Sequence, residues 1–486
     1  MQLPTRPVVP GFHPDPSVCR AGDAYYLACS SFEYAPGVPI YRSTDLRTWK
    51  QIGHALDRPS QLDIDDMPPS GGVFAPTLRY HDGRFWMITT NLFRQPGLLL
   101  VTAEDPAGPW SEPVWVDDVF GIDPDLAWDD DGTCYVTWCG IGEPGGILQA
   151  ALDPETGKLL TEPRRLWQGT GGSHPEGPHL YKIGEYWYLL IAEGGTERGH
   201  AATIARGPAP SGPFEPCPHN PLLTARGIDV PVQNVGHADL VQTAEGEWVA
   251  LYLGVRALGG IGTAKWHILG RETFASRIAW TDGWPHPADP IEPPPSTAVT
   301  EEVTPTDPLP PSWVTAGRWP GQALRQTGDA WLLTSTGQER AFAGRRQEHL
   351  HIRAQARTSG RGGLELRIDP RHAVTVEIQG ENARAVAHIG SLHVVLGEAP
   401  ATAETVLELR TEQAPGFGAE QGPDTIVAGV SGPGGFTEVG RLDGRYLSTE
   451  VAGGFTGRMI GISCSDGELA LRSFTYFGTD DPETMV

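Results

Sequence analysis

The sequence predicts an all-β protein in which a five-bladed β-propeller is followed by a C-terminal antiparallel β-sandwich. Three observations lead to this fold class: a repeat with five copies in about the first 290 residues, a Pro-rich segment after it, and alternating strands beyond. Gly and Pro account for 61 and 45 of the 486 residues, which is typical of many short elements joined by turns. The length fits two domains. We place them at residues 1–295 and 312–486, with a linker at 296–311.

The repeat is a short polar turn that ends in Gly or Gly-Asp and is followed by an aromatic-rich strand. Its five copies begin at Gly22, Gly83, Gly132, Gly184 and Gly246. Their mean spacing of about 56 residues fits a four-stranded antiparallel blade and excludes the shorter helical solenoids. A pair of ordinary β-sandwiches with coincidentally spaced turns is the alternative interpretation.

A second element precedes each turn by seven to nine residues and marks the start of the preceding strand. The five copies start at Asp15, Ala75, Asp123, Glu176 and His237. If these are the innermost strands of the blades, the repeat symmetry gathers the four polar residues around the central channel. Up to 222 residues separate them along the chain. The period therefore predicts an acidic site.

The segment 290–311 is rich in Pro, so we expect it to run extended between the domains. Beyond it, apolar and polar residues alternate with a period of two, which predicts strands with one buried face. The alternating runs are 349–356, 364–368, 374–378 and 407–410. An antiparallel β-sandwich is the natural arrangement for such strands.

Charge and composition disfavour several classes of function. The formal net charge of −24 repels phosphate backbones and anionic lipid, so we expect neither a nucleic-acid nor a membrane partner. The chain starts without an apolar leader and holds no run of about 18 apolar residues, so we expect a soluble, cytoplasmic protein. A homo-oligomer is compatible with the sequence. The six Cys show neither zinc-site spacing nor a disulfide framework, so we expect free thiols.

Motifs for acyl, phosphoryl and hydride transfer are absent from the sequence, which leaves carboxylate chemistry. Two carboxyl groups can hydrolyse a glycosidic bond when one protonates the leaving oxygen and the other activates water or attacks the anomeric carbon. A third carboxylate raises the pKa of the acid by like-charge repulsion. An isolated Asp-Pro is ordinarily a turn or a helix cap, but three carboxyl residues in repeat register favour a site.

Five segments of the chain carry a family resemblance. They are Pro10-Gly-Phe-His-Pro-Asp15-Pro-Ser17, Gly121-Ile-Asp123-Pro-Asp-Leu126, Ser173-His-Pro-Glu176-Gly-Pro-His-Leu-Tyr181, Gly236-His237-Ala-Asp-Leu240 and Leu269-Gly-Arg271-Glu-Thr-Phe274. Together, and in this order, they resemble glycoside hydrolase family 43, whose two-domain β-xylosidases and α-L-arabinofuranosidases also join a five-bladed propeller to a β-sandwich. The resemblance implies an inverting, exo-acting enzyme. It would release D-xylose, L-arabinose or both from xylo- and arabinoxylo-oligosaccharides.

The resemblance also assigns the three carboxyl residues. It makes Asp15 the general base that activates water, Glu176 the general acid, and Asp123 the residue that tunes the pKa and the orientation of Glu176. No cofactor is required. His237 matches a position beside a Ca²⁺ ion or a water cluster in the channel, so calcium would be bound there. A core histidine is the alternative, since calcium prefers several oxygen ligands.

Four further residues match substrate-binding positions of the family. Arg271 corresponds to an Arg that reaches the sugar in the −1 subsite, for which its planar fork of donors is suited. Phe32 and Phe74 match the flat apolar walls of the sugar pocket, where some members carry Trp in place of Phe74. Phe455 lies in Gly453-Gly-Phe455-Thr-Gly457, which resembles a sandwich loop that closes one side of the pocket. An ion pair for Arg271 and blade packing for the two propeller aromatics are the alternatives.

Two other functions stay open at this point. A fructan-type hydrolase can use a similar five-bladed propeller, but the Trp-Met-Asn-Asp-Pro-Asn-Gly type of opening expected for it is absent. A non-catalytic carbohydrate-binding propeller predicts that at least one of the three carboxyl positions is replaced. All three positions are carboxyls here.

Overall fold

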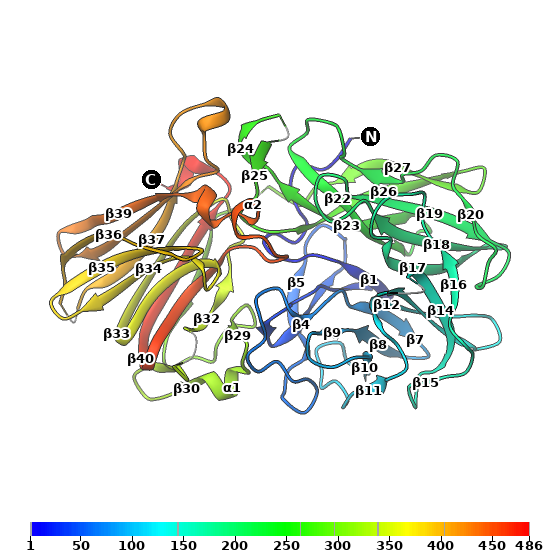
Figure 1. Ribbon diagram of the computed structural model, residues 1–486, viewed down its shortest axis with the longest axis horizontal. Helices are drawn as coiled ribbons and strands as arrows, with labels where there is room; N and C mark the ends of the chain where they lie inside the picture. The colour runs from blue at the N-terminus through cyan, green and yellow to red at the C-terminus, as the bar shows by residue number, and fades with distance from the viewer. Residues whose placement is uncertain are drawn as a thin grey trace. The chain divides into compact units, whose positions relative to one another are not determined.

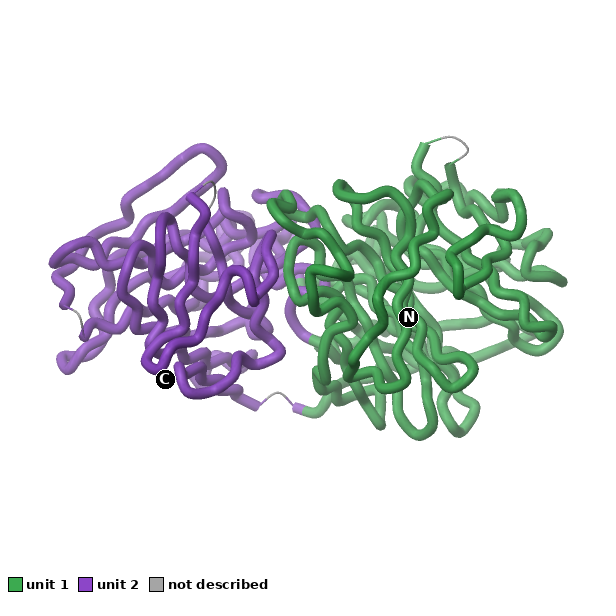
Figure 2. The backbone as a smooth tube through the Cα atoms, turned by 90° about the horizontal axis from the view of Figure 1, so that it is seen from below, with its two compact units in different colours: residues 1–9, 13–256, 272–294 green, residues 10–12, 257–271, 295–486 purple. Residues whose placement is uncertain are grey.

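The computed structural model describes residues 2–142, 145–262, 264–295, 297–337, 340–402 and 404–485. Nearly all regular structure in these ranges is β, and the two α-helices, α1 (Pro320–Ala323) and α2 (Thr449–Ala452), have four residues each. The chain forms two compact units: residues 1–9, 13–256 and 272–294 make the first, and residues 10–12, 257–271 and 295–486 make the second (Figure 2). Among the described residues, no helix is long and apolar enough to cross a membrane.

Unit 1 is a five-bladed propeller, so the predicted fold class is confirmed (Figure 1). In each blade the strands pair antiparallel, and the strand that comes first in the chain lies innermost. The first blade contains β1 (Ser17–Ala21), β2 (Ala24–Ala28), β4 (Gly37–Ser43) and β5 (Lys50–Leu56), and the second contains β7 (Thr77–His81), β8 (Arg84–Thr89), β10 (Leu98–Ala103) and β11 (Val114–Val116). The third contains β12 (Gly121–Trp128), β13 (Cys134–Gly140), β14 (Gly146–Asp153), β15 (Lys158–Leu159) and β16 (Arg164–Trp167), and the fourth contains β17 (Glu176–Ile183), β18 (Tyr186–Glu193), β19 (Ala201–Gly207), β20 (Glu215–Pro216) and β21 (Leu223–Thr224). The fifth contains β22 (Val232–Gln242), β23 (Trp248–Arg256), β26 (Glu272–Thr281) and β27 (Trp284–Ile291).

The inner strands form a closed ring. Each of β1, β7, β12, β17 and β22 contacts the next, and β22 returns to β1. The N-terminal segment runs along the fifth blade, where Val9 pairs with Thr273 of β26. Apolar side chains fill the space between blades. For example, Trp86 of the second blade packs in one cluster with Val136 and Trp138 of the third. Three short strands lie in loops: β3 (Tyr34–Ala35), β6 (Gly72–Val73) and β9 (Asn91–Leu92).

Unit 2 is a β-sandwich built around two long strands, β33 (His351–Asp369) and β40 (Met459–Thr479), which pair along most of their length. The first half of β33 pairs with β37 and its second half with β34, so both strands pass from one layer into the other. The register shifts beside Gly360, which has a φ of +115°. The other strands are β24 (Leu258–Ile261), β25 (Ala264–Trp266), β28 (Val299–Val303), β29 (Val314–Ala316), β30 (Leu324–Gln326), β31 (Trp331–Thr334), β32 (Ala341–Arg346), β34 (His372–Gln379), β35 (Asn382–Ile389), β36 (Leu392–Pro400), β37 (Val406–Glu412), β38 (Thr425–Gly432) and β39 (Gly435–Asp443).

The predicted linker needs a correction. Residues 299–303, in its middle, form β28, which pairs antiparallel with β40 over five residues. The three β-branched residues of Val-Thr-Glu-Glu-Val favour a strand, but the prolines on both sides hid this signal. The segment 257–271 also belongs to unit 2 although it interrupts the fifth blade. All six cysteines are free, as predicted.

Candidate active site

Backbone irregularities mark the positions of the predicted site residues on the inner strands. Asp15, Asp123 and His237 have left-handed φ angles of 54°, 54° and 46°, which is costly for any residue except glycine. The ladders of β12, β17 and β22 shift register beside Asp123, Glu176 and His237. A β-bulge bends the strand and turns a side chain away from the regular pleat. Asp123, Glu176 and His237 therefore lie at irregular positions of the inner strands, and Asp15 lies two residues before β1.

The strand starts differ from those predicted for four blades, and β1 and β7 begin at Ser17 and Thr77, two residues after Asp15 and Ala75. β12 begins at Gly121 and β22 at Val232, so Asp123 and His237 lie inside their strands. Glu176 is the first residue of its strand, as predicted. In β12 and β22 the predicted strand start coincides with the bulge and not with the first backbone pair of the strand, because residues on both sides of a bulge can still pair.

Asp15 is held by partners from two blades. Its side chain is buried, and its Oδ2 accepts a hydrogen bond of 2.5 Å from Ser30 Oγ. Its Oδ1 lies 3.6 Å from His237 Nδ1. Hydrogen bonds to the charged form favour an ionised carboxylate. This surrounding suits Asp15 for accepting a proton.

Glu176 and Asp123 are joined through the backbone of Gly177. The Gly177 N–H donates to Asp123 Oδ2 at 3.1 Å. Gly177 has a φ of +55°, and a Cβ at this position would lie 2.7 Å from His237 Nε2. Only glycine fits this combination of backbone conformation and close approach. Asp15, Asp123, Glu176 and His237 are thus brought together, as the repeat predicts.

Cys139 lies close enough to both Asp123 and Glu176 for their charges to affect its thiol. Burial raises the pKa of the Cys139 thiol well above its ordinary value, and the charges of Asp123 and Glu176 raise it further. Asp123 is buried and Glu176 is partly exposed. Glu176, which the family resemblance predicts to be the general acid, is therefore the more accessible of the two carboxyl groups.

A buried ionic layer follows along the inner strands, at residues 17–18, 79, 125, 179–181 and 239. Arg79 is its centre: Nη2 lies 2.6 Å from Asp125 Oδ1, and Nη1 lies 2.8 Å from Asp239 Oδ2. Burial opposes ionisation of Asp239, but the charges of Arg79 and His179 and the hydrogen bonds from Arg79 and Tyr181 together outweigh it and hold the pKa of Asp239 below its ordinary value. Conversely, burial raises the pKa of Tyr181, and the Asp239 charge raises it further. We call this set of residues the floor.

The floor also satisfies backbone donors on the innermost edges of the blades, which have no further strand to pair with. Oxygen atoms of the floor accept these hydrogen bonds across blade boundaries. The pairs are Leu78 N–H with Ser17 Oγ at 2.9 Å, Leu180 N–H with Asp125 Oδ2 at 2.8 Å, Leu240 N–H with the Tyr181 hydroxyl at 2.9 Å, and Val18 N–H with Asp239 Oδ2 at 2.9 Å. The Arg79–Asp125 ion pair joins the second blade to the third, so the links close a circle.

The two predicted aromatic walls contact each other. The rings of Phe32 and Phe74 meet edge to face, with centroids 5.1 Å apart. Phe32 exchanges backbone hydrogen bonds with Val73 and is 1 % exposed, whereas Phe74 is partly exposed. Phe74 therefore keeps surface for a sugar, and Phe32 mainly supports it.

Arg271 and Phe455 meet within unit 2. Arg271 Nη2 donates to the Phe455 carbonyl oxygen at 3.3 Å, and the guanidinium lies 5.4 Å from the centre of the Phe455 ring. The segment before Arg271 is fixed to the same loop region, because His267 Nδ1 lies 2.7 Å from Glu450 Oε1. The predicted loop 453–457 thus packs against the segment that carries Arg271. Closure of a pocket by this loop stays a prediction.

Comparison with known sequences decides the family. Residues 4–285, more than half of the chain, match the sequence model of "Glycosyl hydrolases family 43". The chain belongs to this family. Residues 304–478 of the enzyme match "Beta xylosidase C-terminal Concanavalin A-like domain", in agreement with the sandwich of unit 2.

Individual relatives of the family 43 enzyme cover most of its length. It is 38 % identical to the non-reducing end alpha-L-arabinofuranosidase BoGH43B of Bacteroides ovatus, over 94 % of this chain and 90 % of the relative. It is 48 % identical to a xylosidase/arabinosidase of Butyrivibrio fibrisolvens, over 59 % of this chain and 56 % of the relative. A solved structure titled Bacteroides ovatus Xyloglucan PUL GH43B superposes with a TM-score of 0.85 and 34 % identity, covering 97 % of this chain and 99 % of that one.

A calcium ion beside His237 is what the family resemblance predicts. Calcium takes six to eight oxygen ligands, and the described part of the enzyme holds no group of three or more His, Cys, Asp or Glu side chains arranged for a metal. Calcium binding stays a prediction.

Sequence reasoning missed Ser30 and the floor of this family 43 enzyme. Ser30 stands in the Ser-Ser-Phe segment, in which the family resemblance points only to Phe32. The floor residues Ser17, Asp125 and Asp239 each lie two positions after a predicted site residue, so the same repeat register could have found them.

Proposed function

We propose that this enzyme removes terminal D-xylose, L-arabinose or both from short xylo- and arabinoxylo-oligosaccharides with inversion at the anomeric carbon. The observation that carries the proposal is the meeting of Asp15, Asp123 and Glu176 near the starts of the inner strands of the propeller. The names of the relatives, an arabinofuranosidase and a xylosidase/arabinosidase, support the choice of pentoses.

In the proposed reaction the Asp15 carboxylate takes a proton from a water molecule as the water oxygen attacks the anomeric carbon. Glu176, in its acid form, gives its proton to the glycosidic oxygen while the bond from carbon to that oxygen breaks. The products are the free pentose and the shortened oligosaccharide. Asp15 is then protonated and Glu176 ionised, and exchange of one proton with solvent restores both.

Asp123 acts in this scheme through position and charge. It holds the Gly177 N–H beside Glu176, and its negative charge favours the protonated form of a neighbouring carboxyl group. Ser30 and His237 support the ionised form of Asp15. The substrate-binding roles of Arg271, Phe74 and Phe455 belong to the same proposal, with Phe32 behind Phe74.

The test compares wild type with Glu176→Gln on p-nitrophenyl β-D-xylopyranoside, p-nitrophenyl α-L-arabinofuranoside and xylobiose. Glu185→Gln is the matched control, because Glu185 is an exposed residue of the same blade. We expect release of at least one pentose, a loss of more than about 100-fold in Glu176→Gln on xylobiose, and no loss in the control. Proton NMR of the first product gives the anomer. Retained configuration, or wild-type turnover by Glu176→Gln on xylobiose, would overturn the proposal.

A further inference from the structure

A cavity lies at the end of the inner strands away from the candidate active site. Its volume is about 370 Å³, within the range of small-molecule sites. The lining residues at the strand ends include Arg20, Trp128, Lys182 and Gln242. They follow the nearest candidate catalytic position by about five residues, or ~16 Å along a strand. The floor comes between the two ends, so this distal cavity is separate from the candidate active site.

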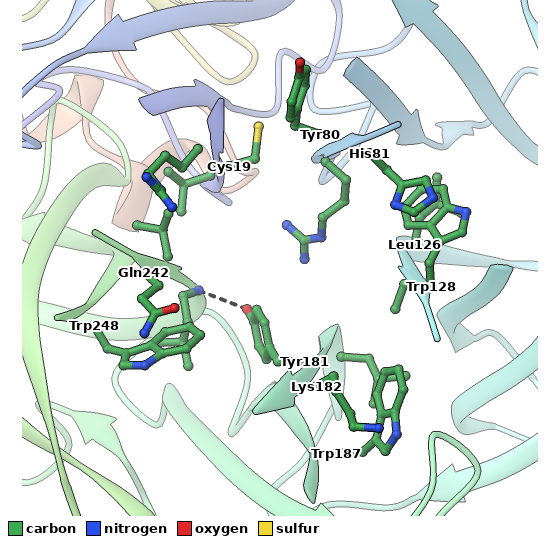
Figure 3. A pocket seen from close by; sticks show the side chains of 17 residues that line it. Cys19, Tyr80, His81, Leu126, Trp128, Tyr181, Lys182, Trp187, Gln242 and Trp248 are labelled. Carbon is green, nitrogen blue, oxygen red and sulfur yellow. Dashed lines mark hydrogen bonds between the residues drawn. The ribbon is translucent and has the colours of Figure 1, made fainter. Parts of the chain in front are cut away.

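Aromatic rings make up much of the wall. Figure 3 shows Trp128, Trp187 and Trp248, which come from three different blades, together with Tyr80 and Tyr181 around the cavity. His81 stacks on Trp128 with ring centroids 4.3 Å apart. Trp248 is partly exposed. Aromatic faces next to polar groups suit ligands with apolar C–H faces and hydroxyl edges, which describes a sugar ring.

The charges of the lining have one sign. None of the described lining residues is Asp or Glu, although the protein carries a net charge of −24. Arg79 is balanced by its two floor carboxylates, so the attraction for an anion comes from the exposed Arg20 and Lys182. Lys182 Nζ lies 5.3 Å from the centre of the Trp187 ring and 3.2 Å from the solvent-exposed Asp130. A cation placed beside an aromatic wall can pair with an anionic group on a stacked ring.

We propose that the distal cavity binds a sugar that carries a carboxylate, that is, a uronic acid unit. Trp128 and Trp248, which are both partly exposed, provide the apolar wall. The Gln242 amide donates to and accepts from hydroxyl groups, and Lys182 and Arg20 pair with the carboxylate. The volume suits one sugar unit and not a long chain. This site goes beyond the proposed hydrolysis, and binding there does not require Asp15 or Glu176.

The experiment measures binding by isothermal titration calorimetry at ~10 mM salt, where screening of charges is weak. The probes are sodium D-glucuronate, D-glucose and inorganic phosphate, each added to the full chain. We expect D-glucuronate to bind at least about tenfold more tightly than D-glucose or phosphate, since only it matches both the wall and the cations. Lys182→Ala should weaken D-glucuronate binding roughly tenfold, and Trp248→Ala should weaken binding as well.

Two controls keep this result separate from the proposed hydrolysis. Lys158→Ala removes an exposed cation from the outer strand β15 and should bind like wild type. Asp15→Asn should also bind like wild type, whatever its activity. Lys182 is exposed, so its variant tests the cavity even if Trp248→Ala fails to fold. Absence of D-glucuronate binding, equal affinity for D-glucose or phosphate, or unchanged affinity in Lys182→Ala would each overturn the proposal.

Discussion

Gly177→Ala tests whether one close backbone approach sets the geometry of the site. A Cβ at Gly177 would lie 2.7 Å from His237 Nε2, and the φ of +55° disfavours any side chain. The left-handed conformation costs alanine about 1–2 kcal/mol. The contact in addition forces His237 or the strand that carries Glu176 to move. Because the Gly177 N–H bonds to Asp123, such a movement displaces two of the three carboxyl groups.

The expected result has two parts that one control separates. A displacement of about 1 Å at reacting groups can cost roughly 100-fold, so we expect kcat/KM on aryl pentosides to fall by about that factor. The backbone strain should lower Tm by roughly 2–8 °C. Gly184, in the same blade, has a φ of +60° with no atom within 4 Å of a built Cβ. Gly184→Ala should therefore lose similar stability but keep its kcat/KM.

Either of two results would refute this reasoning. The first is a Gly177→Ala enzyme with wild-type kcat/KM. The second is a Gly184→Ala enzyme that loses as much activity as Gly177→Ala, because strain alone would then explain the loss. Circular dichroism melts and initial rates on the same preparations give both quantities.

Three further predictions concern the surroundings of the site. Ser30→Ala removes a hydrogen bond to the ionised Asp15, so kcat/KM should fall roughly tenfold in initial-rate assays; an unchanged value contradicts this. Asp239→Asn leaves a buried guanidinium without one of its carboxylates, which should cost about 3–5 kcal/mol in urea unfolding at pH 7. Because the folded-state pKa of Asp239 is lowered, the difference from wild type should persist above the unfolded pKa of about 4 and shrink as the pH falls below it; a pH-independent difference is the contrary result. Phe32→Ala should cost about 3–5 kcal/mol of stability as a buried truncation, whereas Phe74→Ala should chiefly raise KM, and thermal melts with Michaelis curves distinguish the two.

The sequence predicts the parts of this protein that follow from repetition. Equivalent positions of five blades must occupy equivalent places around an axis, so Asp15, Asp123, Glu176 and His237 could be placed together without coordinates. The hydrogen bond from Ser30 and the ion pairs of Arg79 could not, because their partners depend on side-chain conformations at residues up to 160 positions apart. The strand 299–303 was hidden for a different reason, because the prolines on both sides of it indicate an extended linker.

The circle of links between blades explains how the molecule carries strained residues at its site. Each left-handed residue costs about 1–3 kcal/mol and persists only where its surroundings fix it. Floor carboxylates hold the strands two residues after two of the left-handed residues, because Asp125 follows Asp123 and Asp239 follows His237. An isolated buried ion pair would be weak evidence for stability. Here, however, each floor carboxylate also accepts a hydrogen bond from a backbone N–H of the next blade, and a buried donor without a partner costs about 1–3 kcal/mol. The floor therefore fixes the positions of the blades relative to one another. Because the candidate catalytic carboxyl groups lie on different blades, it thereby fixes their positions as well.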